Sequence, residues 1–486
     1  MESLIQPEHD AESHITDSDI TLHSDTSDNK VTLKMDVKDD DYSAKRLSKA
    51  CSDKVESLRR ASVDIEEVDP KDVAAYLSSP PDGGYGWVCV LASFLVHVVT
   101  IGVQSEYGVF QQAYKDTEEF GSVSNLGIAF IGSLSAAMMG LGGIPTGWLV
   151  DQYGYNAVCA AGGIIEMVGL LLASLSTEYW HLVLTHGFLM GLGVSVAYYP
   201  ALSVVSQWFE KRRGIALGIA VSGSGIGGMI LAPLTRILIA QLGWRWSLRI
   251  TAFIVGAIVL AASAVIRVRY RAPRSGFAGG WKVVKDGAFP RIFGIGLFGS
   301  FGYFVPFFFI PSFATNYDLS ASSGALLVGL LNGASALGRL AWGFGADTFG
   351  HVNTLVMCIG MSAVSMLVFW PFATSFATMI GFVLVYGAFS GGFVSLLPSV
   401  IAQFYGKTGH IATITGMIYS AFFLGNLLGA PIAGAMMDRF TTHPTPTTKH
   451  IDFLPSILFG GFMMVTATAF SFSVKFIRSR RLLTRV

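Results

Sequence analysis

Ionisable side chains are rare inside the long apolar stretches of this sequence, so the few that occur there are the first candidates for chemistry. Arg339 lies in such a stretch, with Ser335 four residues and Asn332 seven residues before it. This spacing places the three side chains on one face of a helix. A guanidinium in apolar surroundings could hold a carboxylate through two parallel hydrogen bonds. The alternative is a structural tie between helices.

A second group of candidates lies in the first long apolar stretch. His97 and Gln104 are seven residues apart and share a face of the predicted helix. His97 could relay a proton near neutral pH, or it could be a packing residue with a hydrogen bond. Glu106 could supply a proton-coupling carboxylate, or it could only reach water. For Glu166, His186 and Arg236 the simpler interpretation is contact with neighbouring helices or the interface.

Motifs of enzyme and cofactor sites are missing from the sequence. It contains no Walker A loop, HExxH or GxSxG pattern, so ATP hydrolysis and hydrolase chemistry lack support. The four cysteines are scattered without CxxC spacing, which predicts small buried side chains and no metal site. We therefore expect no enzyme activity, no cofactor and no nucleic-acid partner. The four are Cys51, Cys89, Cys159 and Cys358.

The composition indicates what must position these candidates. Only 14% of the 486 residues are charged and 52% are hydrophobic, far from the composition of a soluble domain. Residues 1–80 hold 19 of the 33 acids and 10 of the 33 bases and are poor in aromatics, which predicts a disordered tail. Arg59-Arg60-Ala61-Ser62 there resembles a phosphorylation site, where regulatory proteins could bind.

Behind the tail, apolar stretches long enough to span a bilayer recur with short polar breaks. They predict an all-α membrane protein with twelve transmembrane helices. The predicted spans are 87–111, 125–150, 156–175, 181–207, 214–240, 248–267, 290–314, 323–345, 352–370, 376–402, 410–437 and 453–476.

Loop charges predict the orientation of these helices. If the tail is cytoplasmic, sixteen Lys and Arg residues face the cytoplasm and five face the other side, which agrees with the positive-inside rule. Both termini are then cytoplasmic. The predicted organisation is a cytoplasmic tail (1–80), an N-terminal six-helix bundle (81–270), a cytoplasmic link (271–289) and a C-terminal six-helix bundle with a short basic tail (290–486).

An internal repeat connects the two predicted bundles. The pattern GxxxDxxG occurs at 147–154 after the second span and again at 343–350 after the eighth, at a constant offset. Asp151 and Asp347 occupy equivalent turns, where a carboxylate can cap a helix or pair with a base across a gate. The repeated pattern resembles the cytoplasmic loop signature of the major facilitator superfamily.

Two further motifs narrow the resemblance. The segment 82–87, DGGYGW, resembles the signature that opens the first span of monocarboxylate-transporter-like proteins. Residues 209–225, FEKRRGIALGIAVSGSG, are similar to the second signature of that family. Its bases Lys211, Arg212 and Arg213 could form gate ion pairs, or could instead set topology and contact anionic lipid. The resemblance covers about residues 81–480 and is strongest to the fungal branch.

The resemblance implies two bundles of six helices around a central cavity, in which Arg339 binds the substrate anion. Tyr198, Tyr303 and Tyr386 lie in helices that line the cavity in this superfamily, so they are candidate wall residues. Two positions depart from the proton-coupled members. Ser335 stands where they carry an Asp, and Ser105 stands where they carry a Lys.

These observations predict a secondary transporter in the plasma membrane that moves a monocarboxylate or related organic anion, with proton-coupled symport as one option. The alternatives are a fungal transporter of a riboflavin-like solute or secondary metabolite, and a transceptor that senses a nutrient. The candidate substrate-binding residues are His97, Gln104, Ser105, Tyr198, Tyr303, Asn332, Ser335, Arg339 and Tyr386. The proton-coupling candidates are Glu106 and His97, and the gating candidates are Asp151, Asp347, Lys211, Arg212 and Arg213.

Overall fold

The computed structural model describes residues 20–25, 32–37, 80–116, 120, 125–270, 282–406, 410–440, 442–445, 448–450 and 452–478. The chain divides into two compact units, Met1–Ser78 and Ser79–Val486. In the first unit, β1 (Ile20–Asp25) and β2 (Thr32–Val37) pair as an antiparallel hairpin. The prediction of a disordered tail did not include these strands. The segment 59–62 lies outside the described residues.

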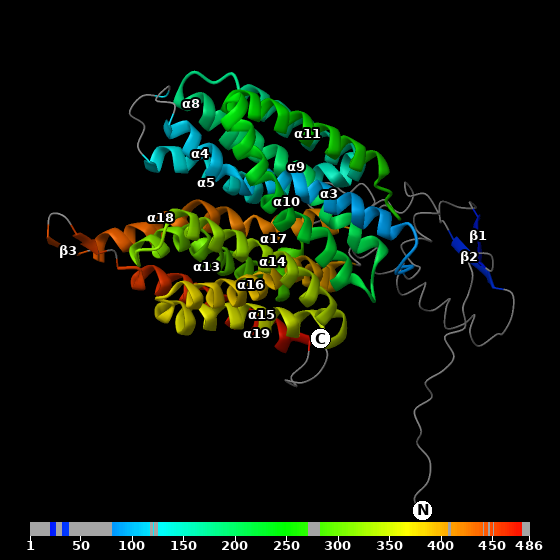
Figure 1. Cartoon of the computed structure of the whole chain (residues 1–486). Helices are drawn as coiled ribbons and strands as arrows, with labels where there is room; N and C mark the ends of the chain where they lie inside the picture. Colours follow the sequence, from blue (N-terminus) through cyan, green and yellow to red (C-terminus); the bar gives the residue numbers. More distant parts are fainter. Residues whose placement is uncertain are drawn as a thin grey trace, which may run out of the picture. The chain divides into compact units, whose positions relative to one another are not determined.

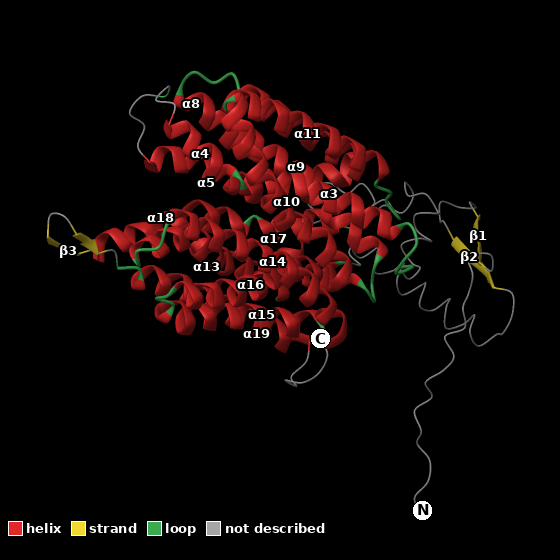
Figure 2. Ribbon diagram, viewed as in Figure 1, coloured by secondary structure: helices red, strands yellow, loops and turns green. Residues whose placement is uncertain are grey.

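The second unit is almost entirely helical (Figure 2), and its first helices form the N-terminal half. A π-helical turn, Val183–Leu189, joins two of them, and a bend separates α5 from α6. The helices of this half are α3 (Gly86–Ser105), α4 (Tyr107–Asp116), α5 (Asn125–Leu141), α6 (Gly143–Tyr153), α7 (Tyr155–Ala173), α8 (Tyr179–Leu182), α9 (Met190–Trp208), α10 (Arg213–Leu242) and α11 (Trp244–Val265).

The C-terminal half begins after the short 3-10 helix Lys282–Lys285. A small hairpin of β3 (Thr442–Thr445) and β4 (Thr448–His450) precedes the last helix. The helices of this half are α13 (Ala288–Asn316), α14 (Ala321–Phe349), α15 (His351–Val364), α16 (Phe376–Tyr405), α17 (Ile411–Tyr419), α18 (Ala421–Phe440) and α19 (Leu454–Arg478). Figure 1 shows the helices of the two halves gathered in two groups.

Within the described residues, eleven helical segments are long and apolar enough to cross a membrane, and the bent pair of α5 and α6 makes a twelfth. The predicted twelve-helix, all-α fold is therefore confirmed, with helix ends that differ from the prediction by a few residues. The bend of 46° lies in the sequence Gly140-Leu141-Gly142-Gly143. Pro145 follows in the first turn of α6, where its missing N–H removes no helical hydrogen bond.

Glycines allow the two halves to pack with their backbones in close contact. A Cβ at Gly343 of α14 would lie 2.6 Å from the carbonyl oxygen of Gly214 in α10, and a Cβ at Gly143 of α6 would lie 2.7 Å from that of Gly416 in α17. Such approaches need small residues, as in other membrane helix pairs. We call the side of the bundle that holds residue 80 and the end of α19 the terminal side, and the opposite side the distal side.

The halves separate toward the distal side. Ala336 of α14 packs against Gly225 of α10. Gly333 and Gly329 lie one and two turns farther along the same face of α14, and a Cβ at either would meet no atom within 4 Å. The halves are therefore packed together on the terminal side, and the distal part of α14 has open space beside Gly333 and Gly329.

Candidate functional site

The two GxxxDxxG turns on the terminal side have the same local geometry. Gly154 and Gly350 end the motifs with φ angles of 87° and 96°, which favour glycine. At the start of the motifs, a Cβ at Gly147 would overlap the backbone of Thr413, and Gly343 has the contact with Gly214 described above. Each motif therefore turns the chain sharply and brings one half against the other. We call the residues Asp151, Asp347, Thr413, Gly214 and Ile215 the gate.

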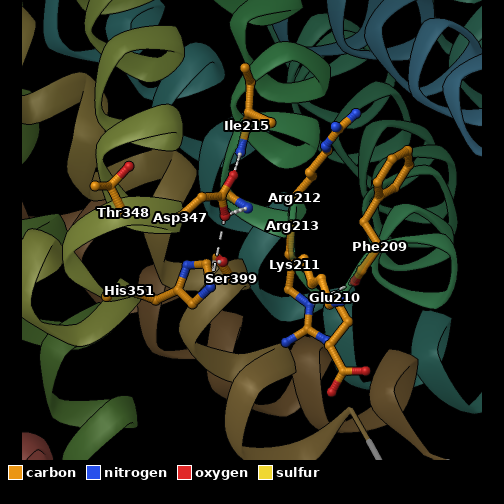
Figure 3. A network of polar contacts seen from close by, with 12 residues as sticks. Phe209, Glu210, Lys211, Arg212, Arg213, Ile215, Asp347, Thr348, His351 and Ser399 are labelled. Atoms are coloured by element: carbon orange, nitrogen blue, oxygen red, sulfur yellow. Dashed lines mark hydrogen bonds and ion pairs between the residues drawn. The ribbon is translucent and has the colours of Figure 1, made fainter. Parts of the chain in front are cut away.

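Asp347 caps a helix of the opposite half (Figure 3). Its two carboxylate oxygens accept hydrogen bonds from the backbone N–H groups of Gly214 (2.7 Å) and Ile215 (2.9 Å) in the first turn of α10. These N–H groups have no partner within the helix, and the positive end of the helix dipole favours a carboxylate there. The Nε2 atom of His351 lies 4.0 Å from the Oδ1 atom of Asp347. The hydroxyl oxygen of Ser399 lies 2.9 Å from Nδ1 of the same histidine.

Asp151 makes the equivalent contact in the opposite direction, from the N-terminal half to the start of α17. The hydroxyl of Thr413 donates a hydrogen bond of 2.5 Å to its carboxylate, and the Nδ1 atom of His410 lies 3.5 Å away. The two gate aspartates therefore each reach across to the other half. Their partners differ, because Asp347 binds backbone N–H groups and Asp151 binds a hydroxyl beside a histidine.

The DGGYGW motif is explained by a third carboxylate near the start of α10. The Oδ1 atom of Asp82 accepts hydrogen bonds from the backbone N–H groups of Glu210, Lys211 and Arg212, at 2.8, 2.8 and 3.0 Å. Asp82 has a φ of 51°, a conformation that Asp tolerates better than most residues. The carboxylate thus fixes the turn between α9 and α10, which is a structural role.

Of the three predicted gate bases, Lys211 and Arg212 have exposed side chains and contribute backbone groups to Asp82. The side chain of Arg213 is buried, and its Nε donates to the carbonyl of Phe209 at 3.1 Å. Arg213 also lies close enough to Asp347 to interact with it electrostatically. Ion pairing at the gate stays a prediction for these bases, and Arg213 is the one with an electrostatic interaction with Asp347 among the described residues.

Arg339 lies in the middle of the structure, at the contact between the halves. Its side chain is 6% exposed. One terminal nitrogen donates hydrogen bonds to the carbonyl of Val221 (3.0 Å) and to the hydroxyl of Ser224, both in α10. Its Nε atom is buried without a hydrogen-bond partner among the described residues. Among the described residues, the hydrogen bonds of this buried positive charge therefore go to neutral groups.

Three aromatic or imidazole side chains from other helices lie within electrostatic range of this guanidinium. Arg339 lies close enough to interact electrostatically with His97 of α3, Tyr198 of α9 and Tyr419 of α17. The rings of His97 and Tyr198 are 4.8 Å apart, and those of Tyr198 and Tyr419 are 6.1 Å apart. We call these four residues the central cluster. It draws two members from each half and lies just on the terminal side of the point where the halves separate.

His97 has a defined hydrogen-bonding state in this cluster. Its Nδ1 atom lies 2.6 Å from the carbonyl oxygen of Ser93, so Nδ1 carries the proton and donates it. The Nε2 atom then presents a lone pair, and it is buried without a partner among the described residues. The central cluster thus offers donors on Arg339 and an acceptor on His97, a combination suited to a weak acid.

The buried glutamates do not neutralise Arg339. Glu106, at the break between α3 and α4, accepts a hydrogen bond of 2.8 Å from the hydroxyl of Thr235 in α10. Glu166 lies inside the N-terminal half against Gly193 of α9, and neither of its oxygens has a hydrogen-bond partner among the described residues. The side chain of Glu106 is 1% exposed, which argues against the alternative that it only reaches water.

The other predicted substrate-binding residues lie outside the central cluster, and three of them make hydrogen bonds elsewhere, whereas the buried hydroxyl of Ser335 has no partner among the described residues. Gln104 donates to Ser135 at 3.1 Å, while Ser105 and Asn332 donate to carbonyls of their own helices. Ser335 packs its backbone against Gly391 of α16. Residues 332, 335 and 339 thus share one face of α14, but their side chains do not all contact the same neighbouring helix.

The two remaining tyrosines lie in the C-terminal half. Tyr386 is fully buried, and its hydroxyl donates to the carbonyl of Tyr303 at 2.8 Å. Tyr303 is 7% exposed and adjoins Phe307 and Phe393.

Sequence reasoning missed three residues of these sites. Ser224 lies within the motif at 209–225, but the sequence shows no reason to pair it with a residue 115 positions later. Tyr419 ends α17 at a break in the eleventh span, and Thr235 lies in an apolar run. The one feature that could have identified them is a hydroxyl or aromatic side chain in a glycine-rich span. Many other residues of the sequence have this feature, so it does not single out these three.

Comparisons with known proteins agree with this architecture. The chain matches the profile of the Major Facilitator Superfamily over residues 86–418 and 292–481. It is similar to the MFS transporter asaE of Aspergillus flavus, with 32% identity over 405 residues that cover 82% of this chain and 89% of that protein. The aspyridones efflux protein apdF of Emericella nidulans is 30% identical, with 86% and 84% covered. The fujikurins efflux protein of Gibberella fujikuroi is 32% identical, with 75% and 79% covered.

Solved structures show the same fold at low sequence identity. The fucose transporter FucP, in its outward conformation, has a TM-score of 0.61 and 15% identity, covering 80% of this chain and 98% of FucP. The human organic anion transporter MFSD10 has a TM-score of 0.63 and 14% identity, covering 81% and 100%. The twelve-helix arrangement, the two gate motifs and these matches lead to one conclusion: the chain belongs to the Major Facilitator Superfamily.

Proposed function

We propose that this protein is a secondary transporter that moves an organic anion across the membrane by alternating access, and that the anion is a fungal secondary metabolite. The names of two relatives, efflux proteins for aspyridones and fujikurins, support a metabolite of this kind more than a small monocarboxylate. The monocarboxylate expected from the DGGYGW motif has weaker support, because the structure assigns the Asp of that motif to a loop contact.

The observation that carries the proposal is the environment of Arg339. A guanidinium remains charged at any physiological pH, and a buried charge without a counter-ion costs several kcal/mol. In this structure its partners are a carbonyl and a hydroxyl, and neither buried glutamate pairs with it. A carboxylate or other acidic group of a substrate would supply the missing charge at the contact between the halves, where binding can influence the gate.

The two sides of the structure support a transport cycle. The gate closes the terminal side, whereas the halves separate distally beyond Ala336. We propose that the terminal side is cytoplasmic, as the loop charges predict, and that the protein lies in the plasma membrane. The structure is then an outward-open state, and the inward-open state requires the gate contacts of Asp151 and Asp347 to break.

Glu106 and His97 are the proposed sites of proton coupling. Glu106 is a buried carboxyl at a helix break with a single hydroxyl donor, and His97 presents a free lone pair beside Arg339. Either group could take up a proton as the substrate leaves. An exporter driven by inward proton movement would exchange proton for anion, in place of the symport that the sequence left as one option.

The test begins with metabolite profiling of cells with and without the protein, to identify the acid that accumulates inside cells when the protein is removed. Flux of that acid is then measured in vesicles at two pH values, with wild type, Arg339→Lys and Arg339→Ala. We expect both variants to lose most of the flux, because Lys keeps the charge but lacks the planar guanidinium.

A matched control is Arg249→Lys, because Arg249 ties α11 to Ser174 within one half and should not affect flux. Normal flux in Arg339→Lys, or an uncharged exported compound, would show that Arg339 is only a structural tie between α10 and α14.

A further inference from the structure

Aromatic side chains continue from the central cluster into the C-terminal half. Tyr198 and Tyr419 face each other across the contact between the halves. Beyond Tyr419, the ring of Phe422 follows at 5.0 Å, then Phe393 at 6.0 Å from Phe422, and Tyr303 at 6.1 Å from Phe393. Four helices of the C-terminal half, α13, α16, α17 and α18, supply the rings from Tyr419 onward, and Tyr303 and Phe393 are distant in the sequence from Tyr419 and Phe422.

Three of these rings are nearly parallel and stack in a row, with Phe422 between the other two. The planes of Tyr419 and Phe422 differ by 12°, and those of Phe422 and Phe393 by 11°. We call Tyr419, Phe422 and Phe393 the aromatic wall. Its first member, Tyr419, also belongs to the central cluster and stands 6.1 Å, ring to ring, from Tyr198 of the same cluster, so the wall begins at the cluster that contains Arg339.

Phe422 is the member of the wall that remains accessible. Tyr419 and Phe393 are 2% and 0% exposed, whereas Phe422 is only partly buried. It follows the break at Ser420 between α17 and α18, and Gly296 of α13 lies against its ring, where a Cβ would approach to 3.1 Å. The absence of a side chain at Gly296 therefore leaves room for this ring orientation.

We infer that the transported anion carries a flat aromatic or conjugated ring, which packs against Phe422 of the aromatic wall while its acidic group binds Arg339. This inference rests on the proposed function and narrows its substrate class. Aromatic faces attract flat rings in offset-stacked or edge-to-face arrangements beyond the effect of buried area alone. A saturated acid of the same size could satisfy the charge of Arg339 but would lose the ring contact.

The test compares two acids with the same carbon skeleton, 2-naphthoate and its saturated form, decahydro-2-naphthoate. Binding to the purified full-length protein in lipid nanodiscs is measured by calorimetry. We expect wild type to bind 2-naphthoate at least tenfold more tightly. Phe422→Leu should reduce this preference to threefold or less. Phe422→Tyr keeps the ring and should keep the preference, which would show that a substitution at this position leaves the site folded.

Phe298→Leu is the matched control, because Phe298 stacks on Phe470 elsewhere in the C-terminal half and its loss should leave the preference unchanged. Arg339→Gln should weaken both acids. A third probe, 2-naphthylmethanol, has the ring without the carboxylate and should bind at least tenfold more weakly than 2-naphthoate.

Each outcome separates the two levels of the proposal. If both acids bind equally and depend on Arg339, the organic-anion transporter stands and the aromatic substrate class is wrong. If 2-naphthylmethanol binds as well as 2-naphthoate, the ring contact stands and the anionic assignment is wrong. If wild type binds neither acid, or if binding does not depend on Arg339, the proposed function fails and the inference fails with it.

Discussion

The contact between Asp347 and the start of α10 makes a quantitative prediction about the gate. In Asp347→Asn, one side-chain oxygen and the negative charge are lost, so the N–H groups of Gly214 and Ile215 share a single neutral acceptor. Hydrogen bonds to charged groups contribute about 1.5–3 kcal/mol and neutral ones about 1 kcal/mol. Loss of the interaction with the helix dipole adds about 0.3–1 kcal/mol. We expect the closed gate to lose about 2 kcal/mol, roughly a 30-fold change in the ratio of closed to open molecules.

The assay measures the distance across the gate with spin labels. Lys211 and Thr348 have exposed side chains on opposite halves and can be replaced by cysteine for labelling. Cys89, Cys159 and Cys358 are buried, so they should label poorly. The remaining Cys51 is replaced by serine. Pulsed electron paramagnetic resonance then gives the populations of short and long distances, which correspond to the closed and open gate.

The control is Asp318→Asn, which makes the same chemical change at an exposed position of the C-terminal half. Asp318 has a φ of 57°, and Asn tolerates that conformation as well as Asp does. The reasoning is refuted if Asp347→Asn changes the ratio of populations by less than threefold, or if Asp318→Asn changes it equally.

Three further predictions concern the terminal side. Asp151→Asn should open the gate less than Asp347→Asn in the same spin-label assay, because a side-chain amide can still accept the hydroxyl hydrogen bond of Thr413; an equal or larger effect would contradict this. Asp82→Ala should lower the Tm of the detergent-solubilised protein by several degrees more than Asp82→Asn, because alanine removes all three hydrogen bonds to the 210–212 backbone. Gly350→Ala should cost about 1 kcal/mol of stability in urea unfolding, because its φ of 96° strains a residue with a Cβ, whereas Gly345→Ala, with only ordinary contacts, should cost less.

Much of the fold follows from the sequence, because the energetic demands of a bilayer act on local composition. A spanning segment must be about 20 residues long and mostly apolar, and its backbone must be hydrogen-bonded within a helix. The number of helices and their approximate ends can therefore be read along the chain. The repeat of GxxxDxxG likewise indicates equivalent turns, because a left-handed turn and a close backbone contact both select glycine.

The candidate sites could be predicted from the sequence less completely than the helices, because they depend on tertiary packing. The sequence identified Arg339, His97 and Tyr198 as separate candidates, and the packing of the two halves placed them together. It placed Asn332 and Ser335 beside Arg339 on one helical face, but Asn332 bonds to a carbonyl of its own helix and the backbone of Ser335 packs against α16. Periodicity shows which residues share a face, and it does not show which helix that face meets.

Only the folded chain decided which residues form hydrogen bonds with Arg339 and Glu106. Ser224 binds Arg339 because glycines of α10 and α14 let the two helices approach closely, and Thr235 binds Glu106 because α3 crosses α10 at Gly102 and Gly227. Such contacts join positions more than a hundred residues apart, and many arrangements of twelve apolar helices satisfy the same hydropathy pattern. The sequence by itself thus determined the membrane helices and their repeated turns. The tertiary packing decided which neutral groups bind Arg339 and which rings from other helices lie within its electrostatic range.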